Sequence, residues 1–146
     1  MRPYLPLIAA AVLSACQQQA AEPRVDEAWV RLPAVSGNPG AAYFTVHGGT
    51  QARTLVAVRA PFAVRAEMHE SMNHGGMMSM APIENVAVPA NATLAFAPGG
   101  KHVMLYDIAP NVRAGATVPL RLEFSEGAPI EIQARVVAAG DAAPQF

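Results

Sequence analysis

Short segments in which apolar and polar residues alternate with a period of two place the strongest constraint on the fold of this chain. The alternation is clearest over 117–124, and it returns over 130–136 after the connection 125–129. This pattern is typical of two half-buried strands joined as a hairpin. No stretch of the sequence has the spacing of an amphipathic helix. The sequence therefore predicts an all-β fold.

Seven further short segments are rich in β-branched and aromatic residues and end at Gly or Pro turns. They cover 27–32, 41–47, 54–58, 62–69, 86–88, 93–97 and 102–108. We expect these segments to form a β-sandwich or barrel of about eight short strands. The Gly- and Asn-containing segment 71–80 is expected to be a loop, although its many methionines are unusual for one.

The N-terminus has the layout of an export signal, with Arg2 before a short apolar run. The run ends in Leu-Ser-Ala-Cys, which resembles the lipobox of bacterial lipoproteins and implies cleavage after residue 15 and lipidation of Cys16. An ordinary signal with an incidental cysteine is the alternative. Gln17 in place of an aspartate slightly favours the outer membrane.

The predicted domains are a signal peptide (1–15), a tether (16–24), one globular domain (25–137) and a loose tail (138–146). We expect the protein to lie in the periplasm and to contact the membrane through the lipid anchor alone. We also expect it to be a monomer. A formal charge of −1 without a basic block excludes nucleic acid as an expected partner. No Ser/His/Asp arrangement, carboxylate pair or cofactor motif predicts an enzyme.

Six of the seven methionines lie between residues 67 and 104. Imidazole nitrogen and thioether sulfur favour Cu(I) over hard ions such as Mg²⁺ or Ca²⁺. The best candidate ligands are His69, Met80, His102 and Met104. His102 and Met104 share one face of a predicted strand, about 6.6 Å apart, so both can reach one ion. Met68 is expected in the core. Because Cys16 is the sole cysteine, a blue-copper site is excluded.

The spacing His-x10-Met-x21-His-x-Met resembles that of the periplasmic copper chaperones of the PCuAC family. Similar segments flank it at 28–31, 69–70, 75–78 and 98–105, so the resemblance covers about 25–137. It implies a cupredoxin-like β-sandwich that binds one Cu(I) and delivers copper for assembly of the CuA site of a respiratory oxidase. The implied partners are an oxidase subunit or a thiol protein of the Sco type. His47 departs from the family, where asparagine is more usual.

The sequence leaves several roles open for other residues near the four candidates. The auxiliary group Met72, His74, Met77 and Met78 could form an entry site, bind a second ion such as Cu(II) through His74, cover the main site or be an oxidisable loop. Glu67 and Glu70 are expected to orient the imidazoles. His69 is expected at a strand end, within reach of a loop. His47 and Trp29 are expected to be structural.

Two other functions remain open from the sequence. A copper buffer or resistance protein would use the same four residues without a dedicated acceptor. A metal-free β-sandwich lipoprotein of envelope assembly would use none of them for metal binding. Transfer of copper to an acceptor separates the first from a chaperone, and the absence of copper binding would favour the second.

Overall fold

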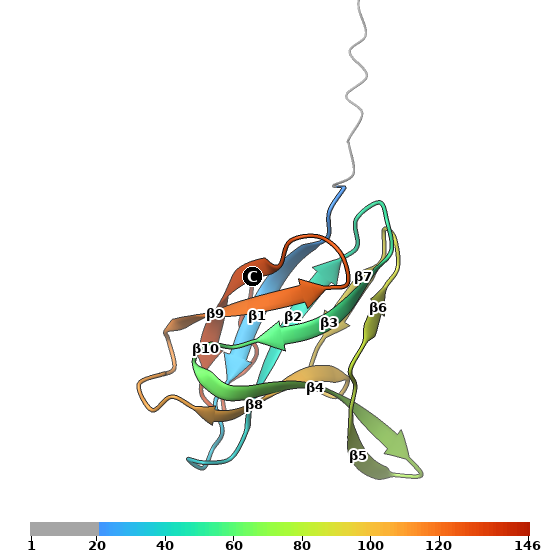
Figure 1. The fold of residues 1–146 in the computed structure, drawn as a ribbon. Helices are drawn as coiled ribbons and strands as arrows, with labels where there is room; N and C mark the ends of the chain where they lie inside the picture. The colour runs from blue at the N-terminus through green and yellow to red at the C-terminus, as the bar shows by residue number, and fades with distance from the viewer. Residues whose placement is uncertain (1–20) are drawn as a thin grey trace, which may run out of the picture.

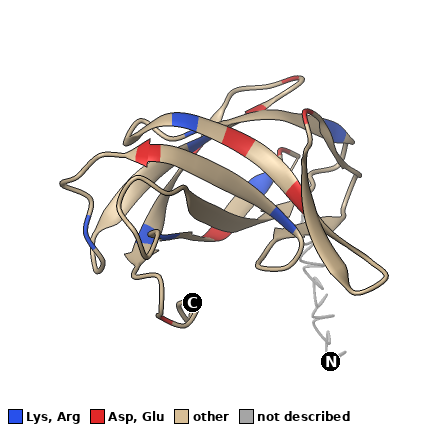
Figure 2. Cartoon of the chain, turned by 90° about the horizontal axis from the view of Figure 1, so that it is seen from below, with Lys and Arg blue, Asp and Glu red and all other residues tan. Residues whose placement is uncertain are grey.

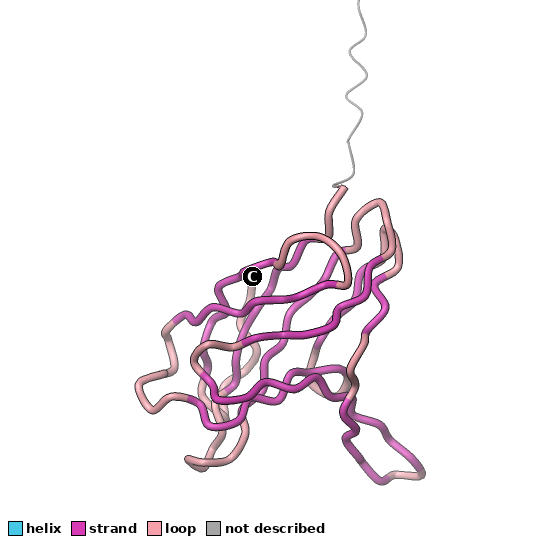
Figure 3. The backbone as a smooth tube through the Cα atoms, in the orientation of Figure 1, coloured by secondary structure: helices cyan, strands magenta, loops and turns pink. Residues whose placement is uncertain are grey.

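The computed structural model describes residues 21–146, which form ten strands and no helix (Figures 1 and 3). The predicted signal peptide, the predicted lipidation at Cys16 and most of the predicted tether lie outside these residues. The strands are β1 (Arg24–Arg31), β2 (Gly40–His47), β3 (Arg53–Arg59), β4 (Ala63–His74), β5 (Met77–Pro82), β6 (Val86–Val88), β7 (Thr93–Phe96), β8 (Lys101–Ile108), β9 (Thr117–Phe124) and β10 (Ile130–Val137). No helix in the described part is long and apolar enough to cross a membrane.

The strands form one sheet in the order β5-β4-β8-β2-β1-β10-β9-β3-β6, with β7 paired to β2. All pairs are antiparallel except β1 with β10. The sheet folds over, so that β9 and β3 lie in front of β1 and β2 in Figure 1. The core between the layers combines side chains from both halves of the sheet, among them Val30, Phe44, Leu55, Leu105, Leu120 and Leu122. The all-β prediction is confirmed.

Each of the nine segments predicted as strands corresponds to a strand, but the expected loop at 71–80 is wrong. There β4 continues to His74 and β5 pairs with it in an unbroken register, so the structure has a tenth strand. Gly75 and Gly76, with φ of 61° and 85°, supply the two positive φ angles of a two-residue type I′ turn. We call residues 71–82 the methionine hairpin.

The methionine hairpin projects beyond the body of the sheet, at the end opposite to the point where residue 21 enters the fold (Figure 1). That entry point is fixed, because Thr50 donates its backbone N–H to the carbonyl of Ala21 and Arg53 pairs with Glu22 at 3.5 Å. The hairpin and the chain entry are therefore held at opposite ends of one domain.

The segment 138–146 contains no strand, and two arginines hold it against the sheet. Arg31 donates to the carbonyl of Asp141 at 3.1 Å, and Arg135 donates to the carbonyl of Gln145 at 2.7 Å. The Arg135 guanidinium also lies 4.8 Å from the ring centre of Phe146. The end of the chain is thus attached to β1 and β10.

Candidate metal centre

Strand register brings the four candidate ligands to one face of the sheet. In the pairing of β4 with β8, His69 lies opposite His102 and Glu67 lies opposite Met104. In the pairing of β4 with β5, Ser71 lies opposite Met80. Because side chains alternate between faces, positions 67, 69 and 71 of β4 share a face, together with the residues opposite them. His69 is the direct neighbour of His102 and a diagonal neighbour of both Met104 and Met80, and such neighbours lie within about 8 Å.

This ligand face is the outer face of the sheet. The alternate residues Met68, Val103 and Leu105 point the other way, into the core, and are almost fully buried, so the core position predicted for Met68 is confirmed. His69 and His102 are also buried, with 8% and 6% of their surface exposed, whereas Met80 is 60% exposed. The site therefore has a buried imidazole half and an open thioether at the hairpin.

The strand end predicted for His69 is wrong, because β4 extends five residues further, to His74. His69 lies in the middle of a paired strand, with β8 on one side and β5 on the other. A residue between two strands is held more firmly than one at a frayed end, so its imidazole is preorganised for a ligand.

Both imidazoles are oriented by the carbonyl group two residues earlier in the chain. His69 Nδ1 lies 3.3 Å from the carbonyl oxygen of Glu67, and His102 Nδ1 lies 3.0 Å from that of Gly100. A carbonyl oxygen only accepts, so each Nδ1 carries the proton and donates it. Each Nε2 is then left with a free lone pair, which is the form of histidine that binds a metal ion.

The spacing of the two rings fits a shared ion. The ring centres of His69 and His102 are 6.0 Å apart and their planes differ by 23°. Two metal–nitrogen bonds of about 2 Å together with two ring radii of about 1.1 Å span at most about 6.2 Å, when the ion lies on the line between the ring centres, so the observed 6.0 Å is within the range that one ion can bridge. The arrangement can therefore place one soft ion between the two imidazoles, with thioethers completing its coordination.

A cavity of about 370 Å³ opens at the site and is lined by Met80, His102 and Met104. Tyr43 also lines it and packs against Trp29, with ring centres 4.4 Å apart. Burial raises the pKa of Tyr43 despite the nearby Arg31 guanidinium, so its hydroxyl stays neutral. The cavity gives a partner's ligands a route to three of the four candidates, whereas His69 does not line it.

Tyr106 positions the sulfur of Met104, a contact that sequence reasoning missed. Its hydroxyl donates to Met104 Sδ at 3.7 Å, and its ring is covered by the guanidinium of Arg65 at 4.1 Å. Tyr106 is two residues from Met104 on the same strand face. The period of two in the strand could therefore have predicted that these side chains are neighbours. A sulfur held in this way has less freedom to lose on binding an ion.

The sequence predicts that Glu67 and Glu70 orient the imidazoles. This prediction is wrong for both carboxylates. Glu67 contributes its backbone carbonyl to His69, while its carboxylate pairs with Arg65 at 3.3 Å. Glu70 is on the opposite face of β4 and pairs with Lys101 at 2.8 Å. The site is thus built from neutral groups, and both nearby carboxylates are already neutralised by cations.

The auxiliary residues are divided between the two faces of the methionine hairpin. Met78 lies opposite Asn73 and shares the ligand face, whereas Met72, His74 and Met77 occupy the other face. Within residues 21–146, no three His, Cys, Asp or Glu side chains come together as a metal-binding group. The structure therefore gives His74 no such cluster in the described part of the chain.

The methionine hairpin carries no charged side chain between residues 71 and 82. Figure 2 accordingly draws the hairpin entirely in tan, whereas strands of the body carry blue and red residues. Its surface consists of thioethers, amides, hydroxyls and one imidazole. Such a surface repels neither a cation nor a protein of either charge.

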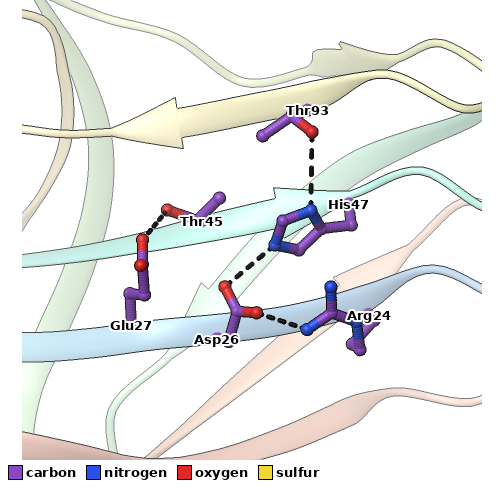
Figure 4. A network of polar contacts seen from close by, with 6 residues as sticks. All are labelled: Arg24, Asp26, Glu27, Thr45, His47 and Thr93. Carbon is purple, nitrogen blue, oxygen red and sulfur yellow. Dashed lines mark hydrogen bonds and ion pairs between the residues drawn. The ribbon is translucent and has the colours of Figure 1, made fainter. Parts of the chain in front are cut away.

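His47 is part of a different network, on β2, and neither ring nitrogen is free. Its Nε2 donates to Asp26 at 2.9 Å, and its Nδ1 lies 3.4 Å from the hydroxyl of Thr93 (Figure 4). Arg24 pairs with the same carboxylate. Burial would raise the pKa of Asp26, but the hydrogen bond and charge of His47, together with Arg24, lower it overall. His47 is accordingly structural in this fold.

Comparisons with known proteins agree with the fold. Residues 24–136 match the family model described as "Putative lipoprotein LpqE-like". The "Putative lipoprotein Lxx21020" of Leifsonia xyli subsp. xyli is 31% identical over 111 residues, which are 75% of this chain and 66% of that protein. The chain thus spans just under two thirds of this relative.

Solved structures of PCuAC domains have the same architecture. The solution structure of CuI-DR1885 from Deinococcus radiodurans is 27% identical with a TM-score of 0.66, and the match covers 87% of this chain and 85% of that one. The copper-bound PCuAC domain from PmoF2 is 21% identical with a TM-score of 0.67, and the match covers 82% and 95%. The cupredoxin-like fold is therefore confirmed, with ten strands instead of about eight.

Proposed function

From the premise that this chain belongs to the LpqE-like lipoprotein family, which its match over residues 24–136 shows, we propose that it is a lipid-anchored periplasmic copper chaperone. It binds one Cu(I) through His69, Met80, His102 and Met104. It delivers that ion for assembly of the CuA site of a respiratory oxidase, either to an oxidase subunit or to a thiol protein of the Sco type. Its anchor is the lipid on Cys16, in the outer membrane.

The observation that carries this proposal is the common face of the four residues. Two buried imidazoles with free Nε2 atoms lie opposite each other, and the two thioethers come from the strand positions beside them. Two further observations support it. The named neighbours include a copper-bound and a Cu(I)-bound protein of the same fold, and the spacing of the four residues resembles that of the PCuAC motif.

The donor set explains the choice of ion and its release. Neutral nitrogen and thioether donors select Cu(I) over Mg²⁺ and Ca²⁺, and they hold it less tightly than clustered thiolates would. No thiolate has to take up a proton when the ion leaves. A thiol-bearing acceptor can therefore draw Cu(I) from this site by successive exchange of ligands.

The position of the site suits delivery to an acceptor. Met80 is exposed and lines the cavity, so it is the ligand that an acceptor meets first. The methionine hairpin lies at the end opposite to residue 21 (Figure 1). A protein anchored through its N-terminus would present the site away from the anchored end.

An anaerobic titration with Cu(I) against a chromophoric chelator tests the binding. We expect one tight equivalent for the native protein and its loss in a variant with all four candidates replaced. Both proteins should carry Cys16→Ser, because a free thiol would itself bind Cu(I). Binding that survives in the fourfold variant would contradict the proposed site. A separate titration with Cu(II) tests the additional site: an equivalent that binds the native protein and is lost in His74→Ala would identify it.

Transfer measurements distinguish a chaperone from a copper buffer. The Cu(I)-loaded protein is mixed with an apo oxidase subunit or an apo thiol protein, and the copper content of each protein is measured after separation at successive times. We expect equimolar transfer at a rate that rises with acceptor concentration, because the ion passes through a shared complex. A rate independent of acceptor concentration would mean free release, as from a buffer.

A further inference from the structure

The three exposed methionines of β5 differ in the face of the hairpin that they occupy. Met78 and Met80 lie opposite Asn73 and Ser71, which share the ligand face with His69. Met77 lies opposite His74, on the other face. The register of β4 with β5 is unbroken over all six residue pairs, so this assignment does not depend on a bulge.

Exposure does not distinguish these residues. Met77 is 77% exposed, Met78 64% and Met80 60%, so an ion or an acceptor in solution can reach each sulfur. The methionines differ only in the face of the hairpin on which they lie. Met78 and Met80 lie on the ligand face, and Met77 lies on the other. The chain thus contains a matched pair, Met78 and Met77, which are adjacent in sequence and similarly exposed but oppositely directed.

We infer that Met78 and Met80 form a transient two-thioether site through which Cu(I) enters and leaves the four-residue site. This inference rests on the proposed function, because it needs Met80 as a ligand of the stored ion. Same-face neighbours on a strand lie about 6.6 Å apart, and two bonds from sulfur to one metal ion span about 4.6 Å. The flexible side chains of two methionines can close that difference.

The chemistry of the pair suits a transit position. Two neutral thioethers select a soft ion, yet they form a weaker site than the full set with two imidazoles. Cu(I) bound by Met78 and Met80 can move inward when the Nε2 atoms of His69 and His102 replace Met78. Reversal of the same exchange presents the ion at the hairpin, where the surface carries no charge that would repel an acceptor.

The test compares Met78→Leu with Met77→Leu in protein that carries Cys16→Ser. Leucine has nearly the same volume as methionine but no sulfur, so folding is preserved and the donor is removed. Equilibrium titration should give one Cu(I) equivalent of unchanged affinity for both variants. Stopped-flow transfer of Cu(I) to excess chelator should be slower by about tenfold in Met78→Leu, which corresponds to ~1.4 kcal/mol in the barrier, and unchanged in Met77→Leu.

A second readout follows the ion directly. In His69→Asn/His102→Asn protein the ion cannot move inward to the imidazoles. With ¹³C-labelled methionine methyl groups in this protein, Cu(I) should shift the Met78 and Met80 signals and leave the Met77 signal in place. Equal transfer rates for the two variants, or equal shifts of the Met78 and Met77 signals, would overturn the transit site. If the native protein still bound one Cu(I) equivalent, the proposed function would stand. Native protein that binds no Cu(I) would overturn both.

Discussion

His47 and the pair His69 and His102 lie on strands of one sheet, but their ring nitrogens are used differently. At His47 a carboxylate and a hydroxyl occupy both nitrogens. At His69 and His102 a backbone carbonyl occupies Nδ1 and leaves Nε2 free. The difference teaches that a hydrogen-bonded imidazole on a strand of this sheet is not by itself a metal ligand. The state of the second ring nitrogen separates a structural histidine from one that can bind an ion.

The sharpest test of this comparison removes a free Nε2. In His102→Asn we expect the Cu(I) affinity to fall by 100-fold or more, because even residues that only support a ligand typically contribute about 10- to 100-fold. Competition with a chromophoric chelator measures the loss. Retention of native affinity would mean that the ion is held elsewhere.

A smaller loss is expected when the open end of the site is altered. Met80→Leu should weaken Cu(I) binding by about tenfold, or ~1.4 kcal/mol, because three donors remain and the exposed residue contributes little to packing. Thermal unfolding of the apo protein should be unchanged. A large drop in the melting temperature would show instead that Met80 is a packing residue.

The reverse pattern is expected at His47. His47→Ala leaves Asp26 and Thr93 without their partner, so it should lower the free energy of unfolding by about 1 kcal/mol, or roughly 4 °C in melting temperature. Its Cu(I) affinity should equal that of the native protein. Loss of copper binding without loss of stability would break the distinction between the two kinds of histidine.

The smallest effect is expected from the carboxylate beside His47. Asp26→Asn should cost under about 1 kcal/mol at neutral pH, since the pair is partly exposed to solvent, which screens it. The folded state holds the pKa of Asp26 below its ordinary value of 3.8, so its contribution is complete above that pH and is lost as the pH falls through the folded pKa. Denaturant unfolding as a function of pH should show the two proteins converging in acid. A difference that persists or widens at low pH would assign the stabilisation to another group.

The sequence was a good guide wherever one face of a strand is buried. Segments such as 117–124 alternate because Leu120 and Leu122 must enter the core, and the register of β9 with β10 follows from that alternation. The four candidate ligands were also identified from their residue types and spacing, and the structure brings them to one face.

The rest could not be predicted because its causes are not local. The methionine hairpin extends past the core, so neither of its faces is buried and no hydrophobic period marks it as a strand. The paired glycines at 75–76 were the one usable signal. The place of Tyr43 at the cavity, with Trp29 packed against it, depends on β2 pairing with β1 and β8, which join distant segments. The hydrogen bonds between the imidazoles and backbone carbonyls could not be predicted either, because they depend on the orientation of each ring in the folded chain.

The central claim is that Cu(I) binds the Nε2 atoms of His69 and His102 while each Nδ1 keeps its proton. Long-range ¹H–¹⁵N correlation spectra of the four histidines, recorded for the apo and the Cu(I)-loaded protein, test it directly. The account predicts a large shift of Nε2 for His69 and His102, with Nδ1 still protonated and the signals of His47 and His74 unchanged. Coordination through Nδ1, or shifts confined to His47 or His74, would contradict it.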